Sequence, residues 1–278
     1  MNTISDSHES DDRQVRKVSL PLKRRLLQVR RVTRLSPYLT RVTLTGDELE
    51  GFVSPSFDDH IKVFLPPSPD ETPVLPTLGP NGPSYPEGAI RPVMRDYSVR
   101  RHDPQAQELD IDFVLHGHGP GASWAAQAKP GQHIGIGGPR GSFIIPHGFD
   151  WHLLIGDETA LPAISRRLEE LPATAQVLAI MQTHHPDAQI PLAAQGDPTI
   201  HWVYRGAGQT GGMSVLERVV RRLQLPEGDG YVWAAGESAV VRDIRKYLVQ
   251  ERGIGKSRIR AASYWREGAS GAHEVIND

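Results

Sequence analysis

The sequence predicts two domains of different class, a six-stranded antiparallel β-barrel followed by a doubly wound parallel α/β domain. Three observations support this prediction. The chain has 278 residues, which is about two domains at roughly 150 residues each. Residues 19–148 alternate short β-type segments with turns rich in glycine and proline, as in a closed antiparallel sheet. From residue 149 to residue 278 strands alternate with helices, as in a parallel sheet with helices on both faces.

The strands expected in the first domain are short and carry apolar residues at alternate positions. The segment 108–115 is an example, because every second residue from Leu109 to Leu115 is apolar. The expected strands cover residues 23–33, 38–45, 59–65, 93–100, 108–115, 132–137 and 142–145. Residues 66–92 are dense in proline and glycine and therefore predict a long loop. A short helix is expected at 121–128, and residues 1–18 are polar enough to form a flexible tail.

The second domain shows compact apolar segments that alternate with amphipathic ones. The expected strands are 151–155, 175–181, 201–204, 231–235 and 258–263. The expected helices are 159–171, 213–225 and 239–251. Ligands of such sheets bind beyond the carboxyl ends of the strands.

Composition excludes several classes of protein. The chain has no cysteine, so disulfide scaffolds, thiol nucleophiles and cysteine-ligated metal centres are excluded. Its net charge of −2 argues against binding to nucleic acid or to an anionic membrane through overall charge. No apolar run approaches the ~18 residues of a membrane span, and the first residues show no signal-peptide pattern. We therefore expect a cytoplasmic protein, and a monomer.

Two strand ends of the second domain carry glycine followed by polar groups. They read Ile155-Gly156-Asp157-Glu158-Thr159 and Ala235-Gly236-Glu237-Ser238. Glycine lets a ligand approach the backbone closely, which suggests a nucleotide site. A purely structural alternative is that Thr159 and Ser238 are helix N-caps. The run at 184–187, HHPD, lacks a further ligand in register and predicts a surface turn, not a metal site.

The first domain has two motifs that are more specific than these strand ends. Arg95-Asp96-Tyr97-Ser98 lies in an expected strand, where Arg95 and Tyr97 share one face because side chains alternate. The segment 116–125, HGHGPGASWA, leads from a strand into a helix. A glycine-rich turn at a helix N-terminus can bind an anion through its backbone N–H groups. An arginine can bind a phosphate in a bidentate manner, with two parallel hydrogen bonds. The alternative is an exposed strand with an ordinary tight turn.

These motifs resemble those of the siderophore-interacting proteins, which are flavin-dependent ferric-siderophore reductases with a ferredoxin-reductase-like fold. Arg95-Asp96-Tyr97-Ser98 matches the R-x-Y-S/T flavin motif. The resemblance extends over residues 23–268 and includes HGHGPGASWA at 116–125, GPRGSF at 138–143, GDETALPAI at 156–164, WAAGE at 233–237 and SYWREG at 263–268, in the family's order.

The resemblance implies an FAD site, with the ring of Tyr97 packed on the isoalloxazine and Ser98 near its reactive edge. The glycine-rich turn would hold the pyrophosphate. The residues that it assigns to FAD are Arg95, Asp96, Tyr97, Ser98, Asp112, Val114, His116, Gly119, Gly121, Ala122, Ser123, Thr159, Tyr264 and Trp265.

The resemblance also implies a nicotinamide site and a basic patch for an anionic ferric siderophore. The first would use Asp157, Glu158, Gly236 and Glu237, and the second Lys62, Arg140 and Arg266. The alternative for each cation is a solvated surface charge. The implied activity passes electrons from NADPH or NADH, or from ferredoxin, through FAD to Fe(III). Two other functions remain open: a reductase of the same architecture with another acceptor, and a flavoprotein that binds siderophores without catalysis.

Overall fold

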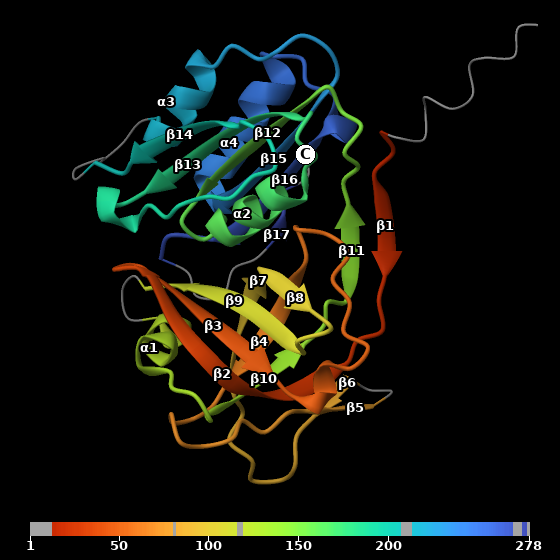
Figure 1. The fold of residues 1–278 in the computed structure, drawn as a ribbon, viewed down its shortest axis with the longest axis vertical. Helices are drawn as coiled ribbons and strands as arrows, with labels where there is room; N and C mark the ends of the chain where they lie inside the picture. The colour runs from red at the N-terminus through yellow and green to blue at the C-terminus, as the bar shows by residue number, and fades with distance from the viewer. Residues whose placement is uncertain (1–12, 80–81, 116–118, 207–212, 269–273, 277–278) are drawn as a thin grey trace, which may run out of the picture. The chain divides into compact units, whose positions relative to one another are not determined.

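The structure is a computed structural model that describes residues 13–79, 82–115, 119–206, 213–268 and 274–276. It divides into two compact units (Figure 1). One consists of Val18–Ser142, and the other combines Met1–Lys17 with Phe143–Asp278. The second division point lies near residue 142, a few residues before the boundary expected at 148/149. No helix in the described part of the chain is both long and apolar enough to span a membrane.

The unit of residues 18–142 is built on an antiparallel, barrel-like sheet of seven strands. The strand order is β7-β4-β10-β2-β3-β9-β8. The bounds are β2 (Arg24–Ser36), β3 (Leu39–Thr45), β4 (His60–Leu65), β7 (Val93–Ser98), β8 (Arg101–Asp103), β9 (Glu108–Val114) and β10 (His133–Gly137). Leu109, Ile111 and Phe113 point into the core and are fully buried, as the alternation predicted.

The expected closed barrel of six strands is wrong in two respects. Six of the seven expected segments are strands of this sheet, and the segment 142–145 lies outside it, in β11 (Gly141–Ile144). The seventh strand of the sheet is β8, whose three residues are too few to show a period of two. No strand pairing in the described residues joins the edges β7 and β8 to each other. Instead Val99 donates its N–H to Asp59 O and Arg100 donates to Asp110 O, so the chain crosses from one edge of the sheet to the other within two residues.

The connections of this unit include one helix and a long loop. The loop expected at 66–92 contains a short hairpin, β5 (Thr77–Gly79) with β6 (Gly82–Ser84). The helix α1 (Pro120–Gln127) starts directly after a glycine. A single 3₁₀ turn, η1 (Asp47–Leu49), follows β3.

The other unit is built on a sheet with the order β14-β13-β12-β15-β16-β17. The strands are β12 (Trp151–Asp157), β13 (Gln176–Thr183), β14 (Thr199–Tyr204), β15 (Gly230–Glu237), β16 (Ile259–Trp265) and β17 (Glu274–Val275). The first five are parallel, but β17 runs antiparallel to β16, so the sheet is mixed and not wholly parallel. A two-residue edge strand leaves no pattern in a sequence, which is why it was not predicted.

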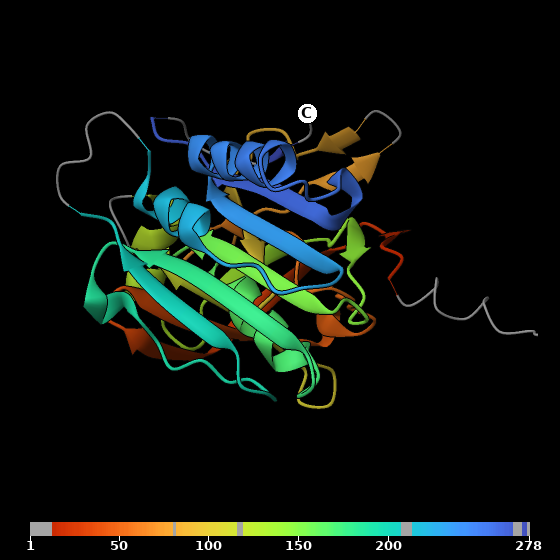
Figure 2. The same cartoon turned by 90° about the horizontal axis from the view of Figure 1, so that it is seen from above.

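Helices cover both faces of this sheet. α3 (Val215–Arg222) and α4 (Ser238–Gln250) lie together on one face, and α2 (Leu161–Glu170) lies on the other (Figure 2). Two 3₁₀ turns, η2 (Pro186–Ala188) and η3 (Lys256–Arg258), complete the unit. The sheet order reverses direction between β12 and β15, which is the position where open α/β sheets bind ligands.

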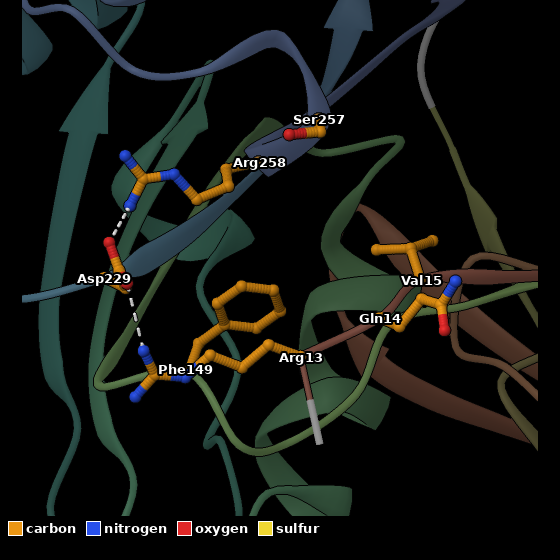
Figure 3. A pocket seen from close by; sticks show the side chains of 7 residues that line it. All are labelled: Arg13, Gln14, Val15, Phe149, Asp229, Ser257 and Arg258. Carbon is orange, nitrogen blue, oxygen red and sulfur yellow. Dashed lines mark hydrogen bonds and ion pairs between the residues drawn. The ribbon is translucent and has the colours of Figure 1, made fainter. Parts of the chain in front are cut away.

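Part of the expected tail is ordered. β1 (Arg16–Ser19) pairs with β11 (Gly141–Ile144) in a two-stranded sheet. Arg13 donates to Gly148 O (2.7 Å), Asp150 Oδ1 (2.6 Å) and Asp229 Oδ2 (3.1 Å). Figure 3 shows Asp229 between the guanidinium groups of Arg13 and Arg258. The expectation of a flexible segment is therefore wrong for residues 13–18, because charges at the amino ends of distant strands bind it. Residues 1–12 lie outside the described part of the chain.

Candidate functional site

The ring of Tyr97 is the centre of the site in the barrel-like unit. It lies 4.4 Å from the ring of Phe113, which in turn lies 5.5 Å from the ring of Trp124. Burial raises the pKa of Tyr97 to about 12, although the positive charge of Arg95 opposes the shift. The phenol is therefore neutral at physiological pH and presents an aromatic surface without charge.

The two predicted motifs of this unit meet at Gly121. A Cβ atom at this position would clash with the Tyr97 hydroxyl group. Gly119 is the N-cap of α1 and offers no capping side chain, and Pro120 follows it. The N–H groups of the first helical turn are thus left for an anionic group. The aromatic ring and the anion site predicted from separate segments lie next to each other.

Arg95 and Ser98 complete this arrangement on β7. Arg95 Nη1 donates to its neighbour's carbonyl, Met94 O, at 2.7 Å. Ser98 is 7% exposed, and its Oγ atom has no hydrogen-bond partner in the described part of the chain. A buried hydroxyl without a partner costs free energy unless a ligand satisfies it. A flavin nucleotide fits these residues, because it has polar ring atoms for Ser98, a planar face for Tyr97 and phosphates for the turn.

Two predicted cofactor residues have carboxylates that are engaged elsewhere. Asp96 lies on the strand face opposite Tyr97 and pairs with Lys62 Nζ at 2.8 Å. The buried carboxylate of Asp112 accepts from Arg41 Nε (2.7 Å) and Nη2 (2.9 Å). The side chain of Asp112 is therefore fully engaged, and that of Asp96 faces away from the Tyr97 ring. Val114 ends β9, and His116 lies outside the described residues.

Asp157 is the centre of the predicted nucleotide site in the α/β unit. Its carboxylate accepts four hydrogen bonds, from Thr159 N (2.9 Å) and Oγ1 (2.6 Å), Glu237 N (3.0 Å) and Trp265 Nε1 (2.7 Å). A Cβ atom at Gly236, where φ is +148°, would lie 2.7 Å from Asp157 Oδ2. Burial raises the pKa of Asp157 despite the hydrogen bonds from Thr159 and Trp265. Asp157 therefore connects the carboxyl ends of β12, β15 and β16 through hydrogen bonds. Its carboxylate has little hydrogen-bonding capacity left for a ligand.

The helix that follows β15 has a different cap from the one considered above. Glu237, not Ser238, is the N-cap of α4, and its Oε2 accepts from Ala239 N (2.7 Å) and Val240 N (3.0 Å). Thr159 does not cap α2, because its hydroxyl donates to Asp157. The expectation that ligands bind beyond the carboxyl ends of parallel strands located these positions. The hydrogen-bond partner of each side chain, however, depends on the neighbouring strand.

Glu158 brings two residues into the site that the sequence did not indicate. Its Oε1 accepts from the backbone N–H of His184 and lies 2.8 Å from His184 Nδ1. Arg205 Nη2 lies 3.9 Å from Oε2, and its guanidinium lies over the ring of Trp265 at 5.4 Å. His184 and Arg205 directly follow β13 and β14. A search for polar residues at the carboxyl ends of all the expected strands could therefore have found them. Tyr264 packs edge-on against Trp233, with ring centroids 6.2 Å apart.

The three predicted substrate cations differ in their surroundings. Lys62 pairs with Asp96, and Arg266 Nη2 lies 3.5 Å from Glu274 Oε1. Arg140 is exposed and forms no ion pair within the described ranges. His185 caps the turn η2 through Asp187 N, as expected of a surface turn. The described residues hold no cluster of three or more side chains that could bind a metal ion.

Comparisons with known proteins match both units of the chain. Residues 28–143 match the siderophore-interacting FAD-binding domain, and residues 149–268 match the siderophore-interacting protein family. The NADPH-dependent ferric-chelate reductase of Escherichia coli (strain K12) is 36% identical over 247 residues, which is 88% of this chain and 93% of that protein.

Solved structures agree with these matches. The siderophore utilization protein from T. fusca has a TM-score of 0.84 and 38% identity, over 93% of this chain and 98% of its own. The ferredoxin reductase of carbazole 1,9a-dioxygenase has a TM-score of 0.62 at 17% identity, over 86% of this chain and 68% of its own, and so shows a ferredoxin-reductase-like fold. On the family matches and the identity to the reductase together, the chain belongs to the siderophore-interacting protein family.

Proposed function

We propose that this protein is a flavin-dependent reductase that passes electrons from NADPH through FAD to Fe(III) in a siderophore, which releases Fe(II). The observation that carries the proposal is the packing of Tyr97 against Gly121 at the start of α1. It combines an uncharged aromatic face with a helix N-terminus that favours phosphate. The likeness to a reductase that is NADPH-dependent and acts on ferric chelates supports the donor and the substrate class.

The residues of the chain bind and orient the cofactor. Arg95 would contact a phosphate of FAD, and the N–H groups of Gly121 and Ala122 would contact the pyrophosphate. Tyr97 would hold the ring system from one side, and Ser98 Oγ would satisfy a polar atom at its edge. When bound, FAD converts the two-electron hydride of NADPH into single electrons, so that one NADPH reduces two Fe(III) ions. Oxygen-rich siderophores hold Fe(II) more weakly than Fe(III), so reduction promotes release of the iron.

The test follows the two half-reactions separately and without oxygen. The purified protein should show a flavin spectrum that NADPH bleaches, and a ferric siderophore should restore it while ferrozine traps Fe(II). NADH and reduced ferredoxin are run in parallel as donors. In Arg95→Ala, FAD affinity should fall roughly 10- to 100-fold, the value of a charged hydrogen bond. A protein without flavin, or one bleached by NADPH that yields no Fe(II), would contradict the proposal.

The substrate side is tested with the three basic residues. We infer that Lys62, Arg140 and Arg266 attract an anionic ferric complex. Arg140 should contribute most, because Lys62 and Arg266 already pair with acids. Replacing all three by alanine should raise KM for an anionic ferric siderophore roughly tenfold at low salt and less at high salt. Flavin reduction by NADPH should not change, and equal KM values at low salt would disprove the basic patch.

A further inference from the structure

A pocket lies at the amino ends of the parallel strands, at the opposite end of the α/β sheet from Asp157 (Figure 3). Asp229, which precedes β15, and Ser257 and Arg258, which precede β16, line it together with Gln14 from the segment before β1. Its volume is about 360 Å³, within the range of roughly 300 to 1,000 Å³ that ligand pockets occupy. None of its described lining residues was assigned above to FAD, to the nicotinamide or to the siderophore.

Arg258 offers this pocket two N–H groups that point in the same direction. Its Nη1 atom donates to Asp229 Oδ1 at 2.6 Å. Its Nε and Nη2 atoms have no hydrogen-bond acceptor among the residues that the structure describes, and the side chain is 32% exposed. This edge of a guanidinium group can bind both oxygens of one carboxylate. Arg41 uses the same two atoms on Asp112, so the free edge of Arg258 is one that holds a carboxylate elsewhere in this chain.

An open space and a hydroxyl group adjoin this edge of Arg258. A Cβ atom at Gly255 would lie 3.6 Å from Arg258 Nε and 4.0 Å from Ser257 Oγ. The φ angle of Gly255 is −59°, a value that other residues also adopt, so the backbone does not require glycine there. The missing side chain leaves room for a ligand atom beside both donors.

Part of the pocket is apolar. The ring of Phe149, a residue that is 7% exposed, packs against the ring of Tyr231 with centroids 5.0 Å apart. Val15 is partly buried and lies with Gln14 on the side of the pocket away from Asp229 (Figure 3). An occupant with an acceptor group at one end and an apolar body at the other would contact both parts of the pocket.

The charges around the pocket favour an occupant with a single negative charge. Asp229 pairs with both Arg13 and Arg258, and Asp150 pairs with Arg13. The two arginines are therefore balanced by two carboxylates. A monocarboxylate adds one charge to this neutral cluster, whereas a phosphate dianion adds two charges close to the carboxylate of Asp229, which repels them.

We propose that this pocket binds a small monocarboxylate with an apolar body. The carboxylate accepts from Nε and Nη2 of Arg258 and from Ser257 Oγ, and the body covers Phe149 and Val15. The inference does not depend on the proposed function, because the residues that carry the electron-transfer site are different ones. A bound ligand should also shield the chain that follows Val15.

The experiment measures binding to the purified protein with its flavin, by nuclear magnetic resonance titration of the ligand. The probe is 2-naphthoate, with 2-naphthamide as its neutral analogue. The wild type should bind 2-naphthoate roughly 10- to 100-fold more tightly than 2-naphthamide, the value of a charged hydrogen bond. Acetate, which cannot cover Phe149, should bind at least about tenfold more weakly than 2-naphthoate. The dianion 2-naphthyl phosphate should bind no more tightly than 2-naphthoate.

Substitutions locate the bound probe. Arg258→Gln should abolish the preference for 2-naphthoate over 2-naphthamide. Arg258→Lys should weaken it severalfold, because lysine keeps the charge but loses the bidentate edge. Gly255→Val should weaken 2-naphthoate binding roughly tenfold, because it fills the space beside Nε without straining the backbone. Bound 2-naphthoate should slow cleavage by trypsin after Arg16 or Lys17 in the wild type and not in Arg258→Gln.

Two control variants separate this pocket from other cationic sites. Arg242→Ala is the matched control, because Arg242 is a half-exposed arginine of the same unit that pairs with an acid outside the pocket, Glu274. The variant with alanine at the three proposed siderophore cations, Lys62, Arg140 and Arg266, tests whether the probe binds there instead. Both controls should bind 2-naphthoate as the wild type does.

Several results would overturn the proposal. One is a wild type that binds 2-naphthoate no more tightly than 2-naphthamide, and another is tighter binding of 2-naphthyl phosphate. A third is unchanged binding in both Arg258→Gln and Gly255→Val. Loss of binding in the triple alanine variant would place the probe at the siderophore cations and would equally exclude the pocket.

Discussion

At Gly121 the absence of one side chain allows an aromatic ring to pack against a helix. The Tyr97 hydroxyl group occupies the space that a Cβ atom would need. The Tyr97 ring also packs on Phe113 from a neighbouring part of the core. Gly121 is therefore required by packing and not by backbone conformation, unlike Gly236, whose φ of +148° favours glycine.

This packing predicts the outcome of a rescue experiment. Gly121→Ala should force Tyr97 to move and lower the free energy of unfolding by about 1 to 3 kcal/mol, a usual value for overpacking. Adding Tyr97→Phe removes the clashing oxygen and leaves the ring carbon Cζ 3.1 Å from the new methyl group, so the double variant should recover much of the loss. Unfolding by denaturant, with and without added FAD, measures both.

Gly119→Ala is the control for this pair, because nothing lies within 4 Å of a Cβ atom there. It should cost less than about 1 kcal/mol, the preference of an N-cap for glycine over alanine. If Gly121→Ala is as stable as Gly119→Ala, Tyr97 is not held where the structure places it.

Residue types near the site were easier to predict than their partners. The sequence alone places Arg95 and Tyr97 on the same face of their strand, because side chains alternate between the two faces. The role of Glu237 as the cap of α4 does not follow from the sequence, because serine is the more common capping residue and Ser238 stands next to it. The choice depends on Asp157, which accepts the N–H of Glu237 from a strand 80 residues away in the sequence. Such partners are determined by strand order, which one sequence does not reveal.

On the scale of elements, the segment around Arg13 joins the α/β unit through one side chain. Arg13 binds Asp150 and Asp229, which precede β12 and β15. Arg258 does not compete with Arg13 for Asp229, because it binds the other carboxylate oxygen. Gly228 leaves room for Asp150, since a Cβ atom there would lie 2.5 Å from its Oδ2. The amino ends of β12 and β15 and the segment before β1 are thus linked by alternating charges, and Figure 3 shows the part of this link formed by Arg13, Asp229 and Arg258.

Removing this link should loosen the segment. Arg13→Ala should lower the melting temperature by a few degrees, since three partly exposed hydrogen bonds are worth about 1 to 2 kcal/mol together. Cleavage by trypsin after Arg16 or Lys17 should become faster. The control is Arg16→Ala, which alters an exposed residue of β1 and should leave the melting temperature unchanged. Equal melting temperatures of wild type and Arg13→Ala would show that the link contributes nothing.

The elements with long patterns were predicted well, and the short ones were not. The core strands β9, β12 and β15 carry continuous or alternating apolar residues. β8 and β17 have three and two residues and lie at sheet edges, where pairing with a neighbour and not their own pattern makes them strands. β1 is exposed at every residue, so nothing in its hydrophobicity could separate it from a tail.

On the scale of the whole molecule, the order of motifs was more informative than composition. Composition excluded whole classes of protein, but the arrangement of a barrel-like sheet before an α/β sheet came from the change in pattern near residue 149. The family followed from motifs in both units. The stability of the whole chain depends on pH through one buried histidine.

His152 on β12 is 1% exposed, and burial lowers its pKa to about 4, with a further contribution from the positive charge of Arg167. Burial also lowers the pKa of His147. In the unfolded chain a histidine takes up its proton near pH 6.5. Between these values the unfolded state binds more protons than the folded state, so stability is lost as the pH falls from about 6.5 towards 4.

The loss due to His152 should reach about 3 kcal/mol at pH 4. His152→Gln abolishes this titration, so its unfolding midpoint in urea should fall less between pH 7 and pH 5 than that of the wild type. Taking the difference between two pH values within each variant removes any constant cost of the substitution. His201→Gln, which changes an exposed histidine of β14, should follow the wild type. If His152→Gln loses as much stability as the wild type over this range, the acid sensitivity arises from other groups, because a side chain that does not titrate cannot contribute to it.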